Sequence, residues 1–365
     1  MLCLGERQNI LIATFLLAIS WITGLRASGQ QNPPEGSAKQ VEDIIDVQPL
    51  DPNKKALLQA GPVEDWTVLT PPSGMKFDAL LAEQDPHESY TRELLELTWR
   101  LGDSLDVWVV RPNTTKNPPV ILYLYSYPSD LERYKNLDFC KFVTQNGFAA
   151  VGFLSALTGP RYHERPLKEW FISNLQESMG SSVHDVQMVL NYLAARGDLD
   201  MTRVGMFGDG SGASIAIMAA AADSRIKVLD LLDPWGDWPD WLAKSSLVPE
   251  KERAAYVKPE FLQKVENLDP VKWLPQLRTQ QVRLQSITKG ITVTPDVARE
   301  RLEAAAPPNV KIVHYESSEE FIKNVASTGK AFDWIKAQLE LPASAEKSTS
   351  VAKSEALRKD DNVRH

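Results

Sequence analysis

The chain has 365 residues, enough for one large hydrophobic core, and a formal net charge of −8. The acidic balance argues against nucleic acid as a partner. Of the two cysteines, Cys3 lies in the leader described next, which leaves Cys140 without a partner for an internal disulfide.

The amino terminus has the pattern of an export signal. An apolar run covers Ile10–Leu25, and Ala27 and Gly29 place small residues where a signal peptidase reads. We predict that residues 1–29 are a signal peptide, and that the mature chain is secreted or periplasmic without stable membrane association. An uncleaved anchor is the alternative, because the run is only slightly shorter than the roughly 18 residues of a spanning helix.

Both ends of the mature chain are polar. Residues 30–89 are predicted to be an N-terminal extension, in which the proline-rich stretch 41–89 forms short helices over the body. Residues 341–365 are small and polar, and are predicted to be a disordered tail. Residues 90–340 remain as the folded domain.

From residue 90 onward the pattern becomes regular. The segments 93–99 and 105–110 flank a Leu-Gly-Asp turn and predict a β-hairpin. Continuous apolar runs then alternate with helical segments, which predicts a buried parallel sheet. The predicted strands are 120–124, 149–154, 204–207, 228–232, 282–287 and 310–315, and the predicted helices are 131–145, 183–195, 214–222, 295–305 and 332–339.

Three of these segments carry a family resemblance. Pro119–Leu124, Asn146–Val151 and Arg203–Gly212 together resemble the α/β-hydrolase superfamily, in particular the branch of acetyl xylan esterases, dienelactone hydrolases and prolyl oligopeptidases. The resemblance covers the chain from about Tyr90 to Leu339. It implies an α/β fold with a mostly parallel eight-stranded sheet and helices on both faces.

In that superfamily a G-x-S-x-G turn holds the nucleophile on a strained elbow. Here the turn reads Gly208-Asp209-Gly210-Ser211-Gly212, so Gly210 takes the nucleophile position. Ser211 could act only in an elbow displaced by one residue, which would put Asp209 where a small residue is needed. A phosphate-binding loop is the structural rival for these glycines, but the turn lies deep in the chain without G-x-G-x-x-G spacing.

The positions that the resemblance implies for the catalytic acid and base are altered too. After the strand 282–287 no carboxylate appears until Asp296, which is placed to open the next helix. After the last strand, Glu319 or Glu320 stands where a histidine is implied, and His314 lies earlier, inside the strand. A serine without such a base is a poor nucleophile at neutral pH.

The loop that helps to bind the oxyanion in relatives carries His-Gly, and here it reads Tyr125-Ser126. Two more histidines, His163 and His184, are candidates for a rewired site, although the position of His184 beside Asp185 favours an ordinary helix first turn. The spacing of histidines and cysteines supports no metal site, and no cofactor is expected.

Three tryptophans follow the strand 228–232, at the edge where α/β sheets bind ligands: Trp235, Trp238 and Trp241. They predict a cleft wall, with His163 beside it, for a small-molecule, carbohydrate or peptide ligand. The alternative is that they seal the following insert onto the sheet.

Two functions therefore remain. The favoured one is a non-catalytic or very weak esterase or peptidase homologue with a ligand-binding cleft. The other is an active serine hydrolase that uses Ser211 on ester or peptide bonds.

Overall fold

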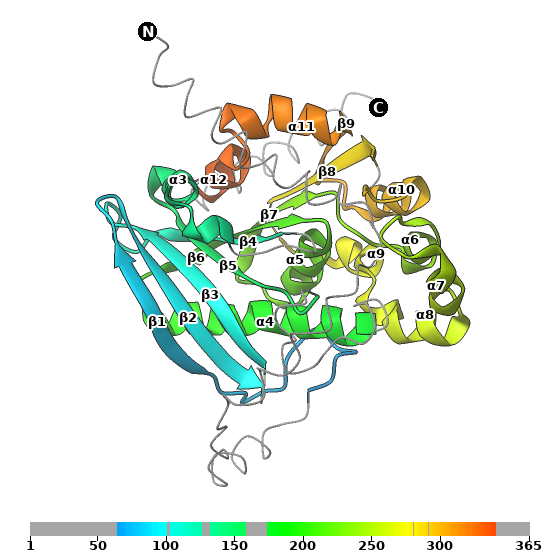
Figure 1. The fold of residues 1–365 in the computed structure, drawn as a ribbon, viewed down its shortest axis with the longest axis horizontal. Helices are drawn as coiled ribbons and strands as arrows, with labels where there is room; N and C mark the ends of the chain where they lie inside the picture. Colours follow the sequence, from blue (N-terminus) through cyan, green and yellow to red (C-terminus); the bar gives the residue numbers. More distant parts are fainter. Residues whose placement is uncertain are drawn as a thin grey trace, which may run out of the picture.

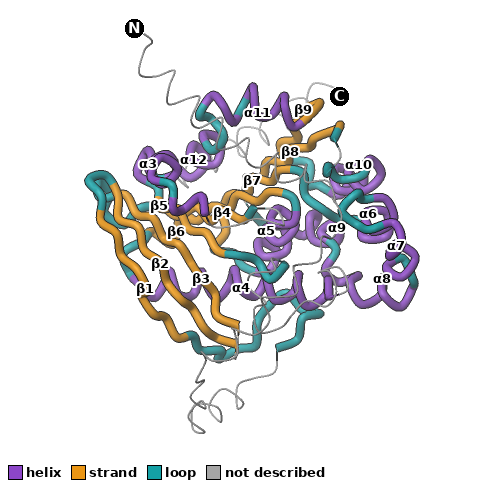
Figure 2. The backbone as a smooth tube through the Cα atoms, in the orientation of Figure 1, coloured by secondary structure: helices purple, strands orange, loops and turns teal. Residues whose placement is uncertain are grey.

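The computed structural model describes residues 64–100, 103–125, 132–157, 174–279, 281–290 and 292–340. The predicted signal peptide and the predicted disordered tail lie outside these residues. The described chain forms a nine-stranded sheet in the order β1-β2-β3-β5-β4-β6-β7-β8-β9 (Figures 1 and 2). Its strands are β1 Asp78–Pro86, β2 Tyr90–Arg100, β3 Asp103–Pro112, β4 Pro119–Leu124, β5 Ala149–Phe153, β6 Asp200–Asp209, β7 Ile226–Leu232, β8 Gln281–Lys289 and β9 Lys311–Ser317.

The pairing of the strands confirms the predicted hairpin and the predicted parallel core. β2 and β3 pair antiparallel, and so do β3 and β5, whereas every pair from β5 through β9 is parallel. Strands β4, β5 and β7 are buried along nearly their whole length and β6 is buried from Val204 to Gly208, which explains the continuous apolar runs in the sequence.

The first strand corrects a prediction. The prediction of short helices over 41–89 is wrong for residues 78–86. These residues form β1, which pairs antiparallel with β2 from Asp78↔Thr98 to Pro86↔Thr91. All but one residue of β1 is exposed, so neither face imposes the alternation that identifies a half-buried strand. The sheet therefore begins before residue 90 and has nine strands instead of eight.

Helices cover both faces of the sheet (Figure 1). One core lies between the sheet and α4, α5 and α10, and a second lies between the sheet and α3 and α12. The helices are α3 Leu137–Val143, α4 Leu175–Arg196, α5 Ser211–Ala222, α6 Trp238–Lys244, α7 Glu250–Tyr256, α8 Pro259–Val265, α9 Pro270–Trp273, α10 Asp296–Ala305, α11 Ser318–Asn324 and α12 Asp333–Glu340, with short 3-10 turns at η2 Glu132–Lys135, η3 Gln145–Gly147, η6 Glu266–Leu268, η7 Leu274–Gln276 and η8 Ala326–Thr328.

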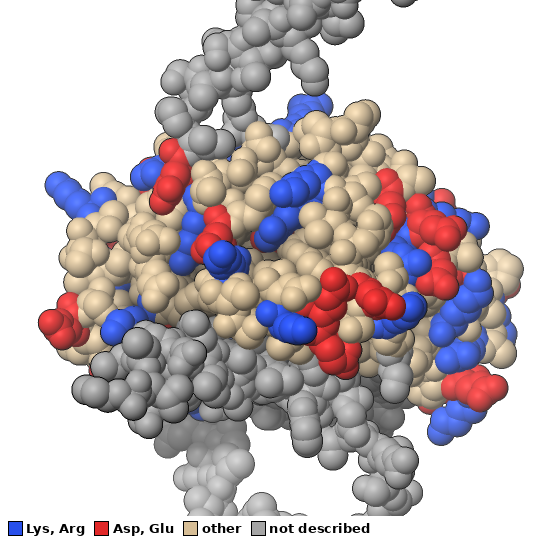
Figure 3. All heavy atoms as spheres, turned by 90° about the horizontal axis from the view of Figure 1, so that it is seen from above, with Lys and Arg blue, Asp and Glu red and all other residues tan. Residues whose placement is uncertain are grey.

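The surface is mixed in charge. On the face shown in Figure 3, acidic and basic side chains are interspersed, without the single-sign basic field that nucleic-acid binding uses. Within the described ranges, no helix combines the length and the apolar character that crossing a membrane requires.

Candidate functional site

A tight turn joins β6 to α5 at the carboxyl edge of the sheet. At its centre Gly210 has φ 52° and ψ −115°, which a residue with a side chain adopts only under strain. The Gly210 amide donates to the carbonyl oxygen of Leu232, the last residue of β7, at 2.8 Å. The backbone is that of a nucleophile elbow, and a glycine holds the strained position.

Two flanking glycines fix the frame of this elbow. A Cβ on Gly208 would lie 2.5 Å from the backbone of α5, and a Cβ on Gly212 would collide with the carbonyl oxygen of Leu124. These close approaches belong to the frame centred on Gly210. Ser211, in contrast, is the first residue of α5 and is fully buried.

Two carboxyl groups with raised pKa values lie at the ends of neighbouring strands: Asp209 is the last residue of β6, and Asp233 directly follows β7. Burial raises the pKa of Asp209 to about 6, against the opposing charge of Arg133. Burial also raises the pKa of Asp233 to about 7; the Thr294 amide donates to its Oδ2 at 3.0 Å, and the charge of Asp209 adds to the rise. Our sequence analysis did not identify Asp233 or Arg133, although Asp233 directly follows a predicted strand.

Tyr125 follows β4 at the position of the oxyanion loop. Its side chain is 6% exposed, and the guanidinium carbon of Arg133 lies 3.3 Å from the centroid of its ring. The arginine therefore covers this ring. Ser126 lies outside the described residues.

The position implied for the catalytic acid holds no carboxylate aimed at the elbow. Asp296 is the first residue of α10, and its Oδ1 accepts from Arg299 at 2.8 Å. Its side chain is 74% exposed. Asp296 thus has the role of a first-turn acid, as its place in the sequence predicts.

The position implied for the base forms a helix cap. β9 runs directly into α11, and Ser317 at the junction accepts from the Glu320 amide at 3.2 Å. Glu320 Oε2 in turn accepts from the Glu316 amide at 2.5 Å. Ser317 thus caps α11, and because β9 ends at Ser317 and α11 begins at Ser318, no loop between them could carry a histidine. His314 lies in β9, with Nε2 3.0 Å from Glu303 Oε1.

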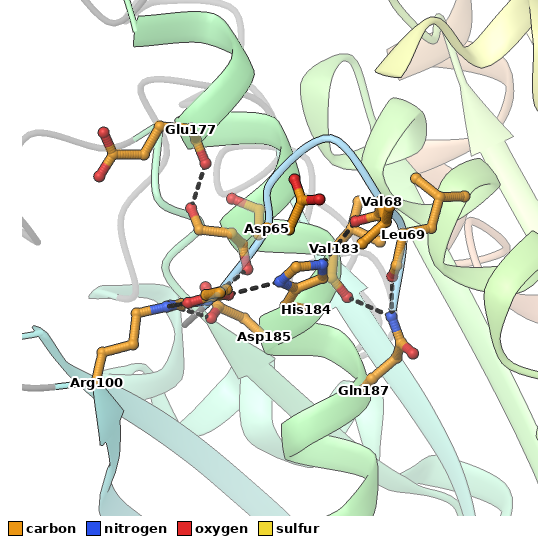
Figure 4. Close-up of polar contacts among 12 residues, drawn as sticks. Asp65, Val68, Leu69, Arg100, Glu177, Val183, His184, Asp185 and Gln187 are labelled. Atoms are coloured by element: carbon orange, nitrogen blue, oxygen red, sulfur yellow. Dashed lines mark hydrogen bonds and ion pairs between the residues drawn. The ribbon is translucent and has the colours of Figure 1, made fainter. Parts of the chain in front are cut away.

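His184 is buried in a different place, under the segment Glu64–Leu69, which we call the strap (Figure 4). Its Nδ1 lies 2.5 Å from Glu64 Oε1, and its Nε2 donates to the Val68 carbonyl oxygen at 2.7 Å. The His184 side chain is fully buried. Both ring nitrogens are occupied, so His184 anchors the strap to α4 instead of acting as a base.

Arg100 completes this buried ionic network. It contacts Glu64 through Nε at 2.5 Å and Nη2 at 2.6 Å, and Asp185 Oδ1 at 2.6 Å (Figure 4). Burial alone would raise the pKa of Glu64, but hydrogen bonds from Arg100 and His184 lower it to about 2. Sequence patterns do not reveal this network, because Glu64 lies 120 residues from its histidine partner.

The three tryptophans do not line a cleft. Trp235, Trp238 and Trp241 are at most 2% exposed and pack on one another, with ring centroids 4.7 and 5.8 Å apart. The Trp238 indole donates to the Leu268 carbonyl oxygen at 3.0 Å, and Asp269 accepts from the Trp238 amide. The predicted cleft wall is corrected: these rings seal the insert that holds α6 to α9 onto the sheet.

His163, the remaining predicted residue of the cleft, lies outside the described residues. Within the described ranges, no group of three or more histidine, cysteine, aspartate or glutamate side chains is arranged to hold a metal ion.

Known structures share this arrangement of strands. The acetyl xylan esterase from Paenibacillus sp. R4 is similar with a TM-score of 0.57 and 15% identity over 78% of this chain and 92% of that one. A putative acetyl xylan esterase from Bacteroides fragilis NCTC 9343 gives a TM-score of 0.52 and 15% identity over 74% and 84% of the two chains.

At the level of sequence the likeness is faint. No protein-family model matches the chain, and no curated protein matches its sequence. Identities of this size show a shared fold and leave the chemistry open. The strand order, the elbow after β6 and these structural neighbours together establish that the chain has the α/β-hydrolase fold.

Proposed function

We propose that this chain is a degenerate member of the esterase and peptidase fold, which binds a ligand at the carboxyl edge of the sheet and hydrolyses it very weakly or not at all. The observation that carries the proposal is Gly210 at the elbow, with φ 52° and no side chain to attack a carbonyl. Loss of a catalytic triad costs on the order of 10⁶ in rate, and oxyanion donors alone retain a small residual acceleration.

The replaced acid and base support the same proposal. A hydroxyl placed at the elbow would find a helix cap at the end of β9 in place of a histidine. It would also lack an acid to orient such a histidine, because Asp296 points to solvent and pairs with Arg299. Three independent positions thus lack the groups that acyl transfer needs.

The alternative is an active serine hydrolase that uses Ser211. A fluorophosphonate probe followed by peptide mapping separates the two, because such a probe labels only activated serines. We expect no labelled serine. Labelling at Ser211 would overturn the proposal and establish the displaced elbow.

We also propose that the protein is exported and that its ligand is a small molecule, a carbohydrate or a peptide. The export signal in the sequence supports the first part, and the names of the structural neighbours as acetyl xylan esterases support the second. Intact-mass measurement of the exported protein should show a chain that begins at or near Gln30. A mass that retains residues 1–29 would contradict cleavage and favour an anchor.

A further inference from the structure

Three buried tyrosines lie on the α3 and α12 side of the elbow. Tyr123, Tyr125 and Tyr134 are 1%, 6% and 0% exposed. Within the described part of the chain, the hydroxyl groups of Tyr123 and Tyr134 have no hydrogen-bond partner, and the donor that acts on the Tyr125 hydroxyl is the Arg133 guanidinium. A buried hydroxyl that lacks a partner loses the hydrogen bonds that it makes with water in the unfolded chain, so such a group of buried hydroxyls is costly.

The three rings are neighbours across adjacent strands. The Tyr134 hydroxyl lies so close to Gly152 of β5 that a Cβ there would overlap it. In the parallel pairing of β4 with β5, Leu122 is opposite Val151, and Tyr123 and Gly152 are the next residues of the two strands. On the other side, the Phe207 ring of β6 lies 6.2 Å from the ring of Tyr123 and 5.9 Å from that of Tyr125.

A fourth donor belongs to the same group. The Arg133 guanidinium lies over the Tyr125 ring, and its Nε is buried without a hydrogen-bond partner in the described residues. Burial raises the pKa of all three phenols, so they remain protonated and able to donate. The group therefore offers three neutral O–H donors and one charged N–H donor.

We propose that the hydroxyls of Tyr123, Tyr125 and Tyr134 and the Nε of Arg133 form an internal site for a small monocarboxylate. A carboxylate accepts several hydrogen bonds at its two oxygens and matches a set composed of donors. The site uses side chains below the elbow and none of the backbone amides of α5. It is therefore independent of the proposed loss of hydrolysis.

Asp209 couples this site to pH. It follows Phe207 by two residues on the same face of β6, and its charge acts on Tyr125. The charged groups that act on it are Arg133, which opposes its raised pKa of about 6, and Asp233 across the strand ends. Below this pKa Asp209 is neutral and no longer repels an anion, so the carboxylate binds more tightly in mild acid.

The test is calorimetric titration of the full exported chain with sodium acetate, against sodium chloride at matched ionic strength. Acetate should bind at about pH 5 and several-fold more weakly at about pH 8. Tyr134→Phe should weaken binding by about tenfold or more while leaving the melting temperature of the free protein unchanged or higher, because it removes an unpartnered hydroxyl.

The matched control is Tyr315→Phe. This buried hydroxyl donates to Gln285 Oε1 at 2.9 Å, so its loss should lower the melting temperature and leave acetate binding unchanged. Asp209→Asn should remove the dependence of binding on pH. Acetate heats no larger than those of chloride, or equal acetate affinity in Tyr134→Phe and the unmodified protein, would overturn the site. If Tyr134→Phe does not fold, Tyr123→Phe gives the same comparison.

Discussion

The elbow after β6 and the end of β9 lie along the same edge of the sheet. The elbow has the backbone expected of a serine hydrolase, whereas the end of β9 lacks the loop that would carry a histidine. At the elbow the backbone is complete: Gly210 has the strained φ, and Gly212 packs against the Leu124 carbonyl. At the end of β9, Ser317 caps α11 by accepting from the Glu320 amide, and Glu320 accepts from the Glu316 amide. Close packing of strand on helix thus surrounds the elbow with glycines, whereas an ordinary helix cap occupies the end of β9.

The largest effect is expected from a substitution that disturbs the close packing of the elbow. Gly212→Ala should lower the free energy of unfolding by about 3 kcal/mol or more, because its Cβ meets rigid backbone at Leu124. Denaturant unfolding measures the loss. Gly197→Ala is the control: its φ of 76° strains the new residue, but its Cβ meets no atom within 4 Å, so it should cost only about 1–2 kcal/mol. Equal losses would show that the elbow is not held by close packing.

A second prediction concerns Glu64, the buried carboxylate that contacts His184 and Arg100. The pKa of Glu64 is lowered from 4.5 to about 2, so its contribution to stability is fully present above pH 4.5 and is lost as the pH falls toward 2. Near neutral pH, Glu64→Gln should lower the free energy of unfolding by about 3 kcal/mol, and the difference should vanish in strong acid.

The control for this prediction is Glu316→Gln. Glu316 pairs with Lys289 at the surface, where both side chains are about 70% exposed, and such pairs contribute little. A loss near neutral pH as small as that of Glu316→Gln would contradict a buried ionic anchor for the strap.

The smallest effect is expected at the end of β9. Ser317→Ala removes the acceptor for the Glu320 amide and should cost about 1 kcal/mol of stability. Thermal unfolding measures this loss, and Ser317→Asp should recover most of it because aspartate is also a good cap. If Ser317→Asp is no more stable than Ser317→Ala, the segment does not act as a helix cap.

Much of the fold could be predicted because buried strands require apolar residues, which form recognisable runs in the sequence. Strand β4 is apolar along its whole length, β6 has a buried apolar segment at Val204–Phe207, and the glycines around Gly210 mark the turn between β6 and α5. β1 was not predicted because nearly all of its residues are exposed, so its sequence lacks the apolar–polar alternation of a half-buried strand.

The site was harder to predict. The absence of a nucleophile side chain follows directly from Gly210, but the fate of the three tryptophans does not, since Trp235 suits a cleft wall as well as a core until its neighbours are known. One sign of the tyrosine group is present in the sequence: Tyr123 lies in the predicted strand 120–124, and Tyr125, two residues on, directly follows that strand. Tyr134 and Arg133 join them only through the tertiary fold.

The most direct test of the central claim is the turnover of p-nitrophenyl acetate by the purified mature protein, measured beside Ser211→Ala and Gly210→Ser. We predict a rate close to background in all three, because a hydroxyl restored at the elbow still lacks a histidine to take its proton and an acid to orient it. Readily measured turnover in the unmodified protein that Ser211→Ala abolishes would contradict the account and identify a working hydrolase with a displaced elbow.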